Sequence, residues 1–117
     1  MDIQKFYETI GVDYTRVLRR LMKEQLVDKY LHLFLEDKSF DRLEKAMEAQ
    51  DYEEAFKAVH TLKGLSLNLE LTPLSDAAAE LSGYLKFQTA ETLKQNEAEE
   101  KYKKVKTEYE TIKNLIY

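Results

Sequence analysis

The sequence predicts an all-α protein, an antiparallel four-helix bundle preceded by short additional N-terminal helices. The chain has only three glycines and one proline in 117 residues, and 34% of its residues are charged, a balance typical of a soluble helical protein. Apolar residues recur at spacings of three and four along most of the chain, and no stretch shows the alternation of a β-strand. Amphipathic helices joined by short loops bury such stripes by packing as a bundle.

Composition also limits the number of domains and the possible chemistry. We expect one domain over residues 1–117, with the core bundle at about 24–116. The absence of cysteine excludes disulfides, thiolate zinc sites and cysteine nucleophiles. The net charge is −4, and no basic cluster is free of acidic residues, so nucleic-acid binding is not expected. The apolar runs are too short for a membrane span or a signal peptide, so we expect a cytoplasmic protein without membrane association.

Three helices are predicted in the first third of the chain. The first has apolar residues at helical spacing from Ile3 to Ile10 and ends at Gly11, and Asp13 is a suitable N-cap for the second. The third covers residues 24–36, with His32 opposite its apolar face and with Leu31 and Leu35 between that face and solvent. The apolar face consists of Leu26, Val27, Tyr30, Leu33 and Phe34.

Four further helices are predicted from capping residues and apolar stripes. The expected N-caps are Ser39, Asp51, Thr72 and Thr89, and Pro73 suits the first position of its helix. The helix that begins after Asp51 is expected to end near Glu70. The last helix is the longest, and its apolar seam consists of Ala98, Tyr102, Val105, Tyr109, Ile112 and Ile116.

One segment, AVHTLKGLSLNLEL from Ala58 to Leu71, contains His60, one of two histidines in the chain. At about 100° per residue, a single stripe on this helix faces the core, formed by Ala55, Ala58, Val59, Leu62, Ser66 and Leu69. His60 lies roughly 150° from the middle of the stripe and should therefore point into water. Five residues surround it on the outer face, and we call them together with His60 the docking surface. They are Phe56, Lys57, Lys63, Gly64 and Leu67.

The same segment resembles a known family. HTLKG, followed by a small residue and then by Asn68, Leu69 and Leu71, resembles the phospho-acceptor motif of histidine-containing phosphotransfer (HPt) domains of bacterial two-component phosphorelays. The resemblance extends over about residues 10 to 86 and includes GVD near Gly11 and the LFLED run. It implies the bundle architecture and a phospho-acceptor role for His60. The chain departs from the family pattern at Glu70, where glycine is usual. It also departs at Ser82 and Gly83, where an acidic residue is common. These departures bear on loop geometry and partner choice.

The chemistry of the docking surface is that of a carrier. A neutral imidazole is nucleophilic near physiological pH and can carry a phosphoryl group covalently. Lys63 supplies a cation one turn from His60, as a phosphoryl contact, and Lys57 supplies another. No carboxylate cluster for Mg²⁺ lies near, so this face could act only within an active site supplied by a partner. We therefore expect no cofactor in this chain, and Mg²⁺ on the partner receiver domain.

Access and docking are the expected roles of the other residues. Gly64, four positions after His60, lacks a side chain that would crowd the imidazole, although glycine within a helix costs about 1 kcal/mol relative to alanine. Phe56, Lys57 and Leu67 are expected to contact the partner, together with an apolar shoulder formed by Leu31 and Leu35.

The resulting hypothesis is a phosphorelay intermediate, a phosphocarrier rather than an enzyme. It would pass a phosphoryl group through His60 to or from an aspartate of a response-regulator receiver domain. A hybrid sensor histidine kinase is expected as a second partner, and the protein is expected to be a monomer. A kinase dimerisation domain is less favoured, because Thr61 rather than an acidic residue follows His60, and Pro73 comes only at the next helix. The other alternative is a non-phosphorylated four-helix adaptor that docks a receiver or kinase, and the retention of His60, Lys63 and Gly64 argues against it. His32 is interpreted as an ordinary surface histidine.

Overall fold

The computed structural model describes residues 1–116, which contain seven α-helices and no strand. The helices are α1 (Ile3–Thr9), α2 (Tyr14–Leu21), α3 (Glu24–Glu36), α4 (Ser39–Glu48), α5 (Tyr52–Asn68), α6 (Thr72–Lys86) and α7 (Gln95–Ile116). The all-α class predicted from the sequence is confirmed.

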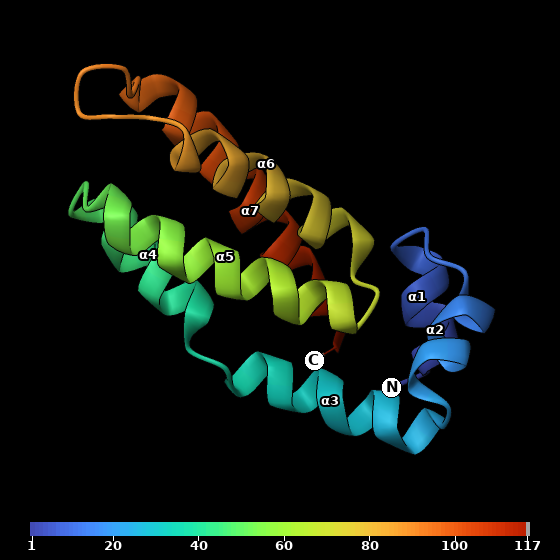
Figure 1. Ribbon diagram of the computed structural model, residues 1–117. Coiled ribbons are helices and arrows are strands. Elements are labelled where there is room, and N and C mark those ends of the chain that lie inside the picture. The colour runs from blue at the N-terminus through green and yellow to red at the C-terminus, as the bar shows by residue number, and fades with distance from the viewer. Residues whose placement is uncertain (117) are drawn as a thin grey trace.

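The helices form an elongated bundle with extents of 47 × 21 × 19 Å (Figure 1). α5 packs against α4 on one side and α6 on the other, and α6 packs against α7. α3 and α4 follow one another along the bundle and run antiparallel to α5, as Figure 1 shows. The short helices α1 and α2 lie at the end of the bundle where α5 turns into α6 (Figure 1).

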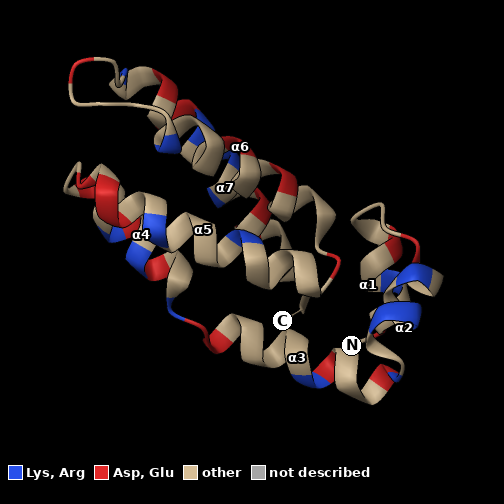
Figure 2. Ribbon diagram, in the orientation of Figure 1, with Lys and Arg blue, Asp and Glu red and all other residues tan. Residues whose placement is uncertain are grey.

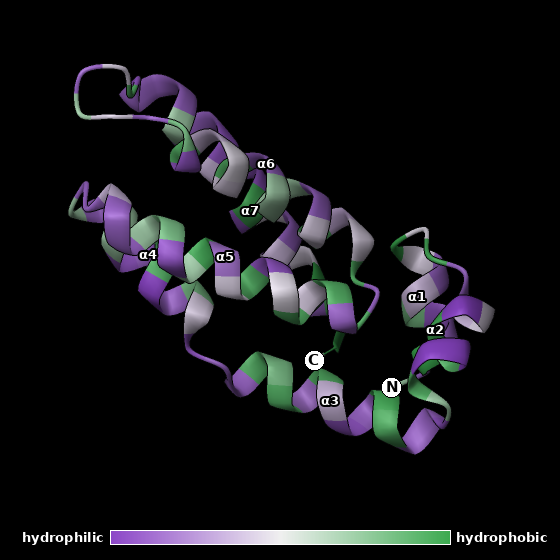
Figure 3. Ribbon diagram, viewed as in Figure 1, coloured by the Kyte–Doolittle hydropathy of each residue, from purple (hydrophilic) through white to green (hydrophobic). Residues whose placement is uncertain are grey.

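The predicted apolar stripes of α4 to α7 form the core. In α5 the buried residues are Ala55, Ala58, Val59, Leu62 and Ser66, as the periodicity predicts. In α7 they are the six residues of the predicted seam. In Figure 3 hydrophilic residues lie on the outer sides of α6 and α7, where the chain meets water. A buried Leu or Val contributes about 1.5–3 kcal/mol relative to the exposed side chain, so these stripes dominate the stability of the bundle.

Three aromatic rings join α4 to α7. Phe40 stacks on Tyr109 with 4.2 Å between ring centroids and 6° between planes, and it lies 6.4 Å from Tyr102. Phe34 of α3 lies 5.8 Å from Tyr109 as well. Such ring pairs add about 0.5–1.5 kcal/mol beyond the area they bury. Tyr109 therefore ties both α3 and α4 to the last helix.

Side-chain caps confirm two predicted helix starts and correct two others. The carboxylate of Asp13 accepts a hydrogen bond from the Thr15 amide, and that of Asp51 accepts one from Glu54. Ser39, in contrast, is the first residue of α4, and its amide donates to the Asp37 carboxylate at 2.8 Å. Thr72 lies inside α6, which starts without a side-chain cap.

The predicted start of the last helix at Thr89 is wrong. Thr89 lies in the loop between α6 and α7, where its amide donates to the Thr92 hydroxyl at 2.8 Å, and α7 begins at Gln95. The loop is anchored by Tyr84, whose hydroxyl accepts a hydrogen bond from the Lys94 amide at 2.8 Å. A threonine pair that closes a turn gives the same local sequence signal as an N-cap.

The predicted face of α3 is also partly wrong. Leu31 is fully buried together with Val27, whereas Tyr30 is 40% and Leu33 48% exposed. Leu35 is half-buried, as expected. α3 carries apolar residues over slightly more than half of its circumference, so the sequence allows more than one stripe. Packing against the rest of the bundle selects the face that contains Leu31.

Candidate functional site

His60 lies in the middle of α5, and its side chain is exposed. The five other residues of the docking surface lie within about 60° of it around the helix axis. None of them is buried, and the side chain of Leu67 is 46% exposed. Phe56 and Lys63 are half-buried, and Phe56 lies on the side of α5 that faces the end of α6. The six residues therefore lie together on one outer face of α5, as their spacing in the sequence predicts.

The imidazole of His60 has a ring contact with one neighbour, and its nitrogens make no hydrogen bond within the described residues. The ring of Phe56 lies 5.8 Å from it, with 28° between the ring planes. Phe56 also lines a groove of about 660 Å³ between α5, the end of α6 and the following loop. Within residues 1–116, neither ring nitrogen of His60 has a hydrogen-bond partner. His60 is exposed, so no hydrogen bond within the described residues has to break before a ring nitrogen can react.

The two lysines of the docking surface differ in their contacts. The ammonium of Lys57 lies 3.9 Å from the Glu53 carboxylate, an exposed pair of the kind that contributes little to stability. Lys63 has no ion-pair partner within residues 1–116. Its charge is therefore available to an anionic group brought to His60, which is one helical turn away.

Gly64 is exposed, and a Cβ built at this position would meet no heavy atom within 4 Å. Tight helix packing therefore does not require a glycine here. A larger side chain would instead project into the open space beside His60, which supports the expected role in access.

A model of the Hpt domain family matches residues 25–115. The chain belongs to the Hpt domain family. This assigns it to phosphotransfer in two-component signalling, in which Hpt domains act as phosphocarriers that interact with receiver and kinase domains. No match to the chain is found among curated proteins or among solved structures. The matched region covers α4 to α6 and all but one end residue of α3 and of α7, and it excludes α1 and α2.

One of the proposed partner contacts of this Hpt domain is corrected by the structure. Leu31 is 0% exposed and cannot touch a partner. Tyr30 and Leu33 are exposed instead, and they line a shallow groove of about 300 Å³ between α3 and the last turns of α5. Leu35 remains half-exposed on α3. The two exposed residues were missed because the sequence places both on the buried face of α3.

The end of α5 shows why Glu70 is an unusual residue at this position of the chain. The Leu71 amide donates to the Ser66 carbonyl and the Glu70 amide to the Leu67 carbonyl, at 2.9 and 3.1 Å. This pair of bonds forms a Schellman motif, which favours glycine at the position of Glu70. Glu70 has φ +54°, a left-handed conformation that costs a residue with a side chain about 1–2 kcal/mol. Its carboxylate contacts two arginines of α2, as described below.

The remaining polar residues of the site have local roles. The Ser66 hydroxyl is buried and donates to the Leu62 carbonyl at 2.8 Å, so it satisfies the helix backbone. His32 is exposed, and its Nδ1 lies 2.8 Å from the Asp28 carbonyl oxygen. Residues 1–116 contain no group of three or more His, Cys, Asp or Glu side chains arranged to hold a metal ion. In the same range, no helix combines the length and apolar character needed to cross a membrane.

Proposed function

We propose that this Hpt domain is a phosphorelay intermediate in which His60 receives a phosphoryl group from, or returns it to, an aspartate of a receiver domain. The observation that carries the proposal is the exposed imidazole of His60, whose two nitrogens have no partner within residues 1–116. Lys63 without an ion-pair partner and the open space at Gly64 support it.

Transfer would proceed by attack of a neutral imidazole nitrogen on the phosphorus of the aspartyl phosphate. The N–P bond forms while the P–O bond to the carboxylate breaks, and the aspartate leaves as a carboxylate. Because phosphoryl transfer depends chiefly on positioning and charge neutralisation, the role of Lys63 is to neutralise charge on the transferred group. Mg²⁺ would be held by the acidic residues of the receiver domain, and this chain would need no cofactor.

Docking would use the apolar residues beside the imidazole. Phe56 and Leu67 are both accessible and flank His60 along α5, with Leu35 of α3 as a further apolar contact. Exposed apolar residues bordered by charge commonly mark an interaction surface. Lys57 and Lys63 would face the acidic pocket of the receiver and guide its approach. A hybrid sensor histidine kinase is the proposed source of the phosphoryl group.

The test is transfer from a phosphorylated receiver domain. The protein is mixed with the receiver and Mg²⁺, and the phosphate on each chain is followed over time. Phosphate that is labile in acid and stable in base should appear on this chain, because a phosphoimidazole has that stability. Binding of the receiver without any such phosphate would contradict the proposal and indicate an adaptor that docks without carrying phosphate.

A further inference from the structure

The side chain of Glu70, just after α5, is bound by two arginines of α2. Its Oε1 lies 3.0 Å from Nη1 of Arg20, and its Oε2 lies 3.3 Å from Nε of Arg16. The Glu70 side chain is only 10% exposed, whereas those of the two arginines are 46% and 69% exposed. Figure 2 shows the acidic turn between α5 and α6 facing the basic helix α2. The carboxylate thus joins two parts of the chain that are 50 residues apart.

The N-terminal helices also bind the backbone at the end of α5. A helix leaves its last carbonyl groups without partners inside the helix. Nη1 of Arg20 donates to the Leu67 carbonyl at 2.9 Å, and the Tyr7 hydroxyl donates to the Leu69 carbonyl at 2.7 Å. The last turn of α5 is therefore fixed from outside, by α1 and α2.

This turn carries one end of the docking surface. Leu67 lies about 20° from His60 around the helix axis and, at 1.5 Å per residue, about 10 Å further along it. Its carbonyl is bound by Arg20 while its side chain faces solvent. If α2 moved away from the end of α5, the position of Leu67 would therefore change. α2 has this influence although it lies outside the region that matches the family model.

We propose that Glu70 is a positioning residue for receiver docking. By holding Arg16 and Arg20 against the end of α5, it fixes the turn that presents Leu67 to the partner. Glu70 lies about 15 Å from His60 along the axis of α5, so it touches no reacting atom. The inference rests on the proposed function, because it assigns the residue that shapes the same docking surface.

A purely structural role for Glu70 and its two arginine partners predicts different kinetics from a positioning role. If Glu70 only stabilised the fold, its loss would affect reaction with every phosphoryl donor equally. If it positions Leu67, its loss should raise the KM for a phosphorylated receiver and leave the maximal rate almost unchanged. Reaction with phosphoramidate, which needs no docking surface and releases ammonia as the phosphoryl group moves to the imidazole, should also be unchanged.

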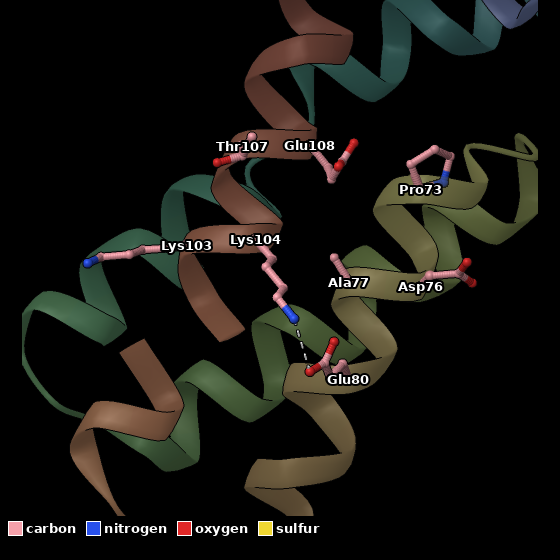
Figure 4. A pocket seen from close by; sticks show the side chains of 8 residues that line it. All are labelled: Pro73, Asp76, Ala77, Glu80, Lys103, Lys104, Thr107 and Glu108. Carbon is pink, nitrogen blue, oxygen red and sulfur yellow. Dashed lines mark ion pairs between the residues drawn. The ribbon is translucent and has the colours of Figure 1, made fainter. Parts of the chain in front are cut away.

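The experiment compares Glu70→Gln with a matched control, Glu80→Gln. Glu80 also pairs with two cations, but between α6 and α7: Lys101 at 3.1 Å and Lys104 at 3.5 Å. Figure 4 shows the pair of Glu80 with Lys104. Glu70→Gln should raise the KM for the receiver by about five-fold because Leu67 is no longer held in place, with maximal rate and phosphoramidate rate within about two-fold of wild type. Glu80→Gln should change none of the three quantities.

A second variant tests the same contact in case Glu70→Gln does not fold. Arg20→Gln replaces a half-exposed side chain and should raise the receiver KM in the same way. The inference is overturned if Glu70→Gln leaves that KM unchanged, or if the receiver and phosphoramidate rates fall together in both variants. Wild-type protein that accepts phosphate while Glu70→Gln behaves like Glu80→Gln refutes the positioning role alone. Wild-type protein that accepts none from the receiver refutes the proposed function as well.

Discussion

The ring of Phe56 lies over one side of the His60 imidazole, with 5.8 Å between the ring centroids. The two residues are one helical turn apart, so α5 itself sets this arrangement. Phe56 is only half-buried, and its remaining surface faces outward beside the groove toward α6. One aromatic side chain therefore restricts the His60 ring on one side and, in the proposed function, also contacts the partner.

Truncation of this contact should weaken docking more than chemistry. Phe56→Ala and Leu67→Ala should each raise the receiver Kd by about ten-fold, since loss of a central apolar contact commonly costs more than 1 kcal/mol. The maximal transfer rate should change less. Isothermal titration calorimetry and single-turnover transfer measure the two quantities. Leu115→Ala, at a 37% exposed leucine of α7, is the control, and an equal effect in this variant would contradict the docking surface.

Removal of the Lys63 charge should have the opposite effect. Lys63→Ala should slow transfer by about ten-fold and reduce its dependence on salt, with little change in Kd, because a cation aimed at the phosphoryl group acts mainly on the transition state. Lys57→Ala should have a smaller effect, since Lys57 is near Glu53. Transfer rates at two ionic strengths provide the test. If Lys63→Ala weakens binding without slowing transfer at saturation, its role is docking alone.

Gly64 should show opposite effects on stability and activity. Gly64→Leu should raise the free energy of unfolding by up to about 1 kcal/mol, because glycine is a poor helix former and a Cβ at this position meets nothing within 4 Å. It should also block transfer by covering His60. The control is Gly83→Leu, at an exposed glycine of α6 where a Cβ also meets nothing within 4 Å. This variant should stabilise the protein without blocking phosphoryl transfer. Full activity of stable Gly64→Leu would remove Gly64 from the site.

The Tyr7 hydroxyl should make stability sensitive to alkali. Burial first, and then the nearby Tyr14 and Glu70, raise the pKa of Tyr7 above its ordinary value of 10.0. Because the folded pKa lies above the unfolded one, the contribution is complete below pH 10 and is lost as the pH rises further. Tyr7→Phe should cost about 1 kcal/mol at pH 7, since the Leu69 carbonyl loses its donor.

The measurement for Tyr7 is urea unfolding across pH 7 to about 11. The loss of stability above pH 10 should be less steep in Tyr7→Phe than in wild type. Tyr30→Phe, at a 40% exposed tyrosine, is the control and should follow the wild-type profile. Parallel pH profiles for wild type and Tyr7→Phe would show that this hydroxyl is not the group responsible.

The sequence was most informative where one helical face alone could be apolar. In α5 the stripe through Val59 and Leu62 admits one orientation, so the outward position of His60 follows from it and is confirmed. In α3 the apolar residues cover slightly more than half of the circumference, so only packing could decide between Leu31 and Leu33. Local capping signals were weaker, because hydroxyl side chains such as Thr89 satisfy backbone groups in turns as readily as at helix starts.

The contacts of Glu70 could not have been predicted from spacing. The sequence marks Glu70 only as a departure from the family pattern. Its two arginine partners lie 50 or more residues earlier, on a helix whose place at the end of α5 depends on the whole fold. A charged residue at a position that favours glycine is nevertheless a usable signal, because its strain requires a compensating contact.

In the proposed relay His60 carries the phosphoryl group, and the chain contains only one other histidine, His32. The decisive measurement is the intact mass, at neutral pH, of wild type, His60→Gln and His32→Gln after incubation with a phosphorylated receiver. Wild type and His32→Gln should each gain one phosphoryl group. His60→Gln should gain none, although its stability should stay within about 0.5 kcal/mol of wild type, as for an ordinary surface substitution. Phosphate on His60→Gln, or its absence from His32→Gln, would show that His60 is not the residue that carries the phosphoryl group.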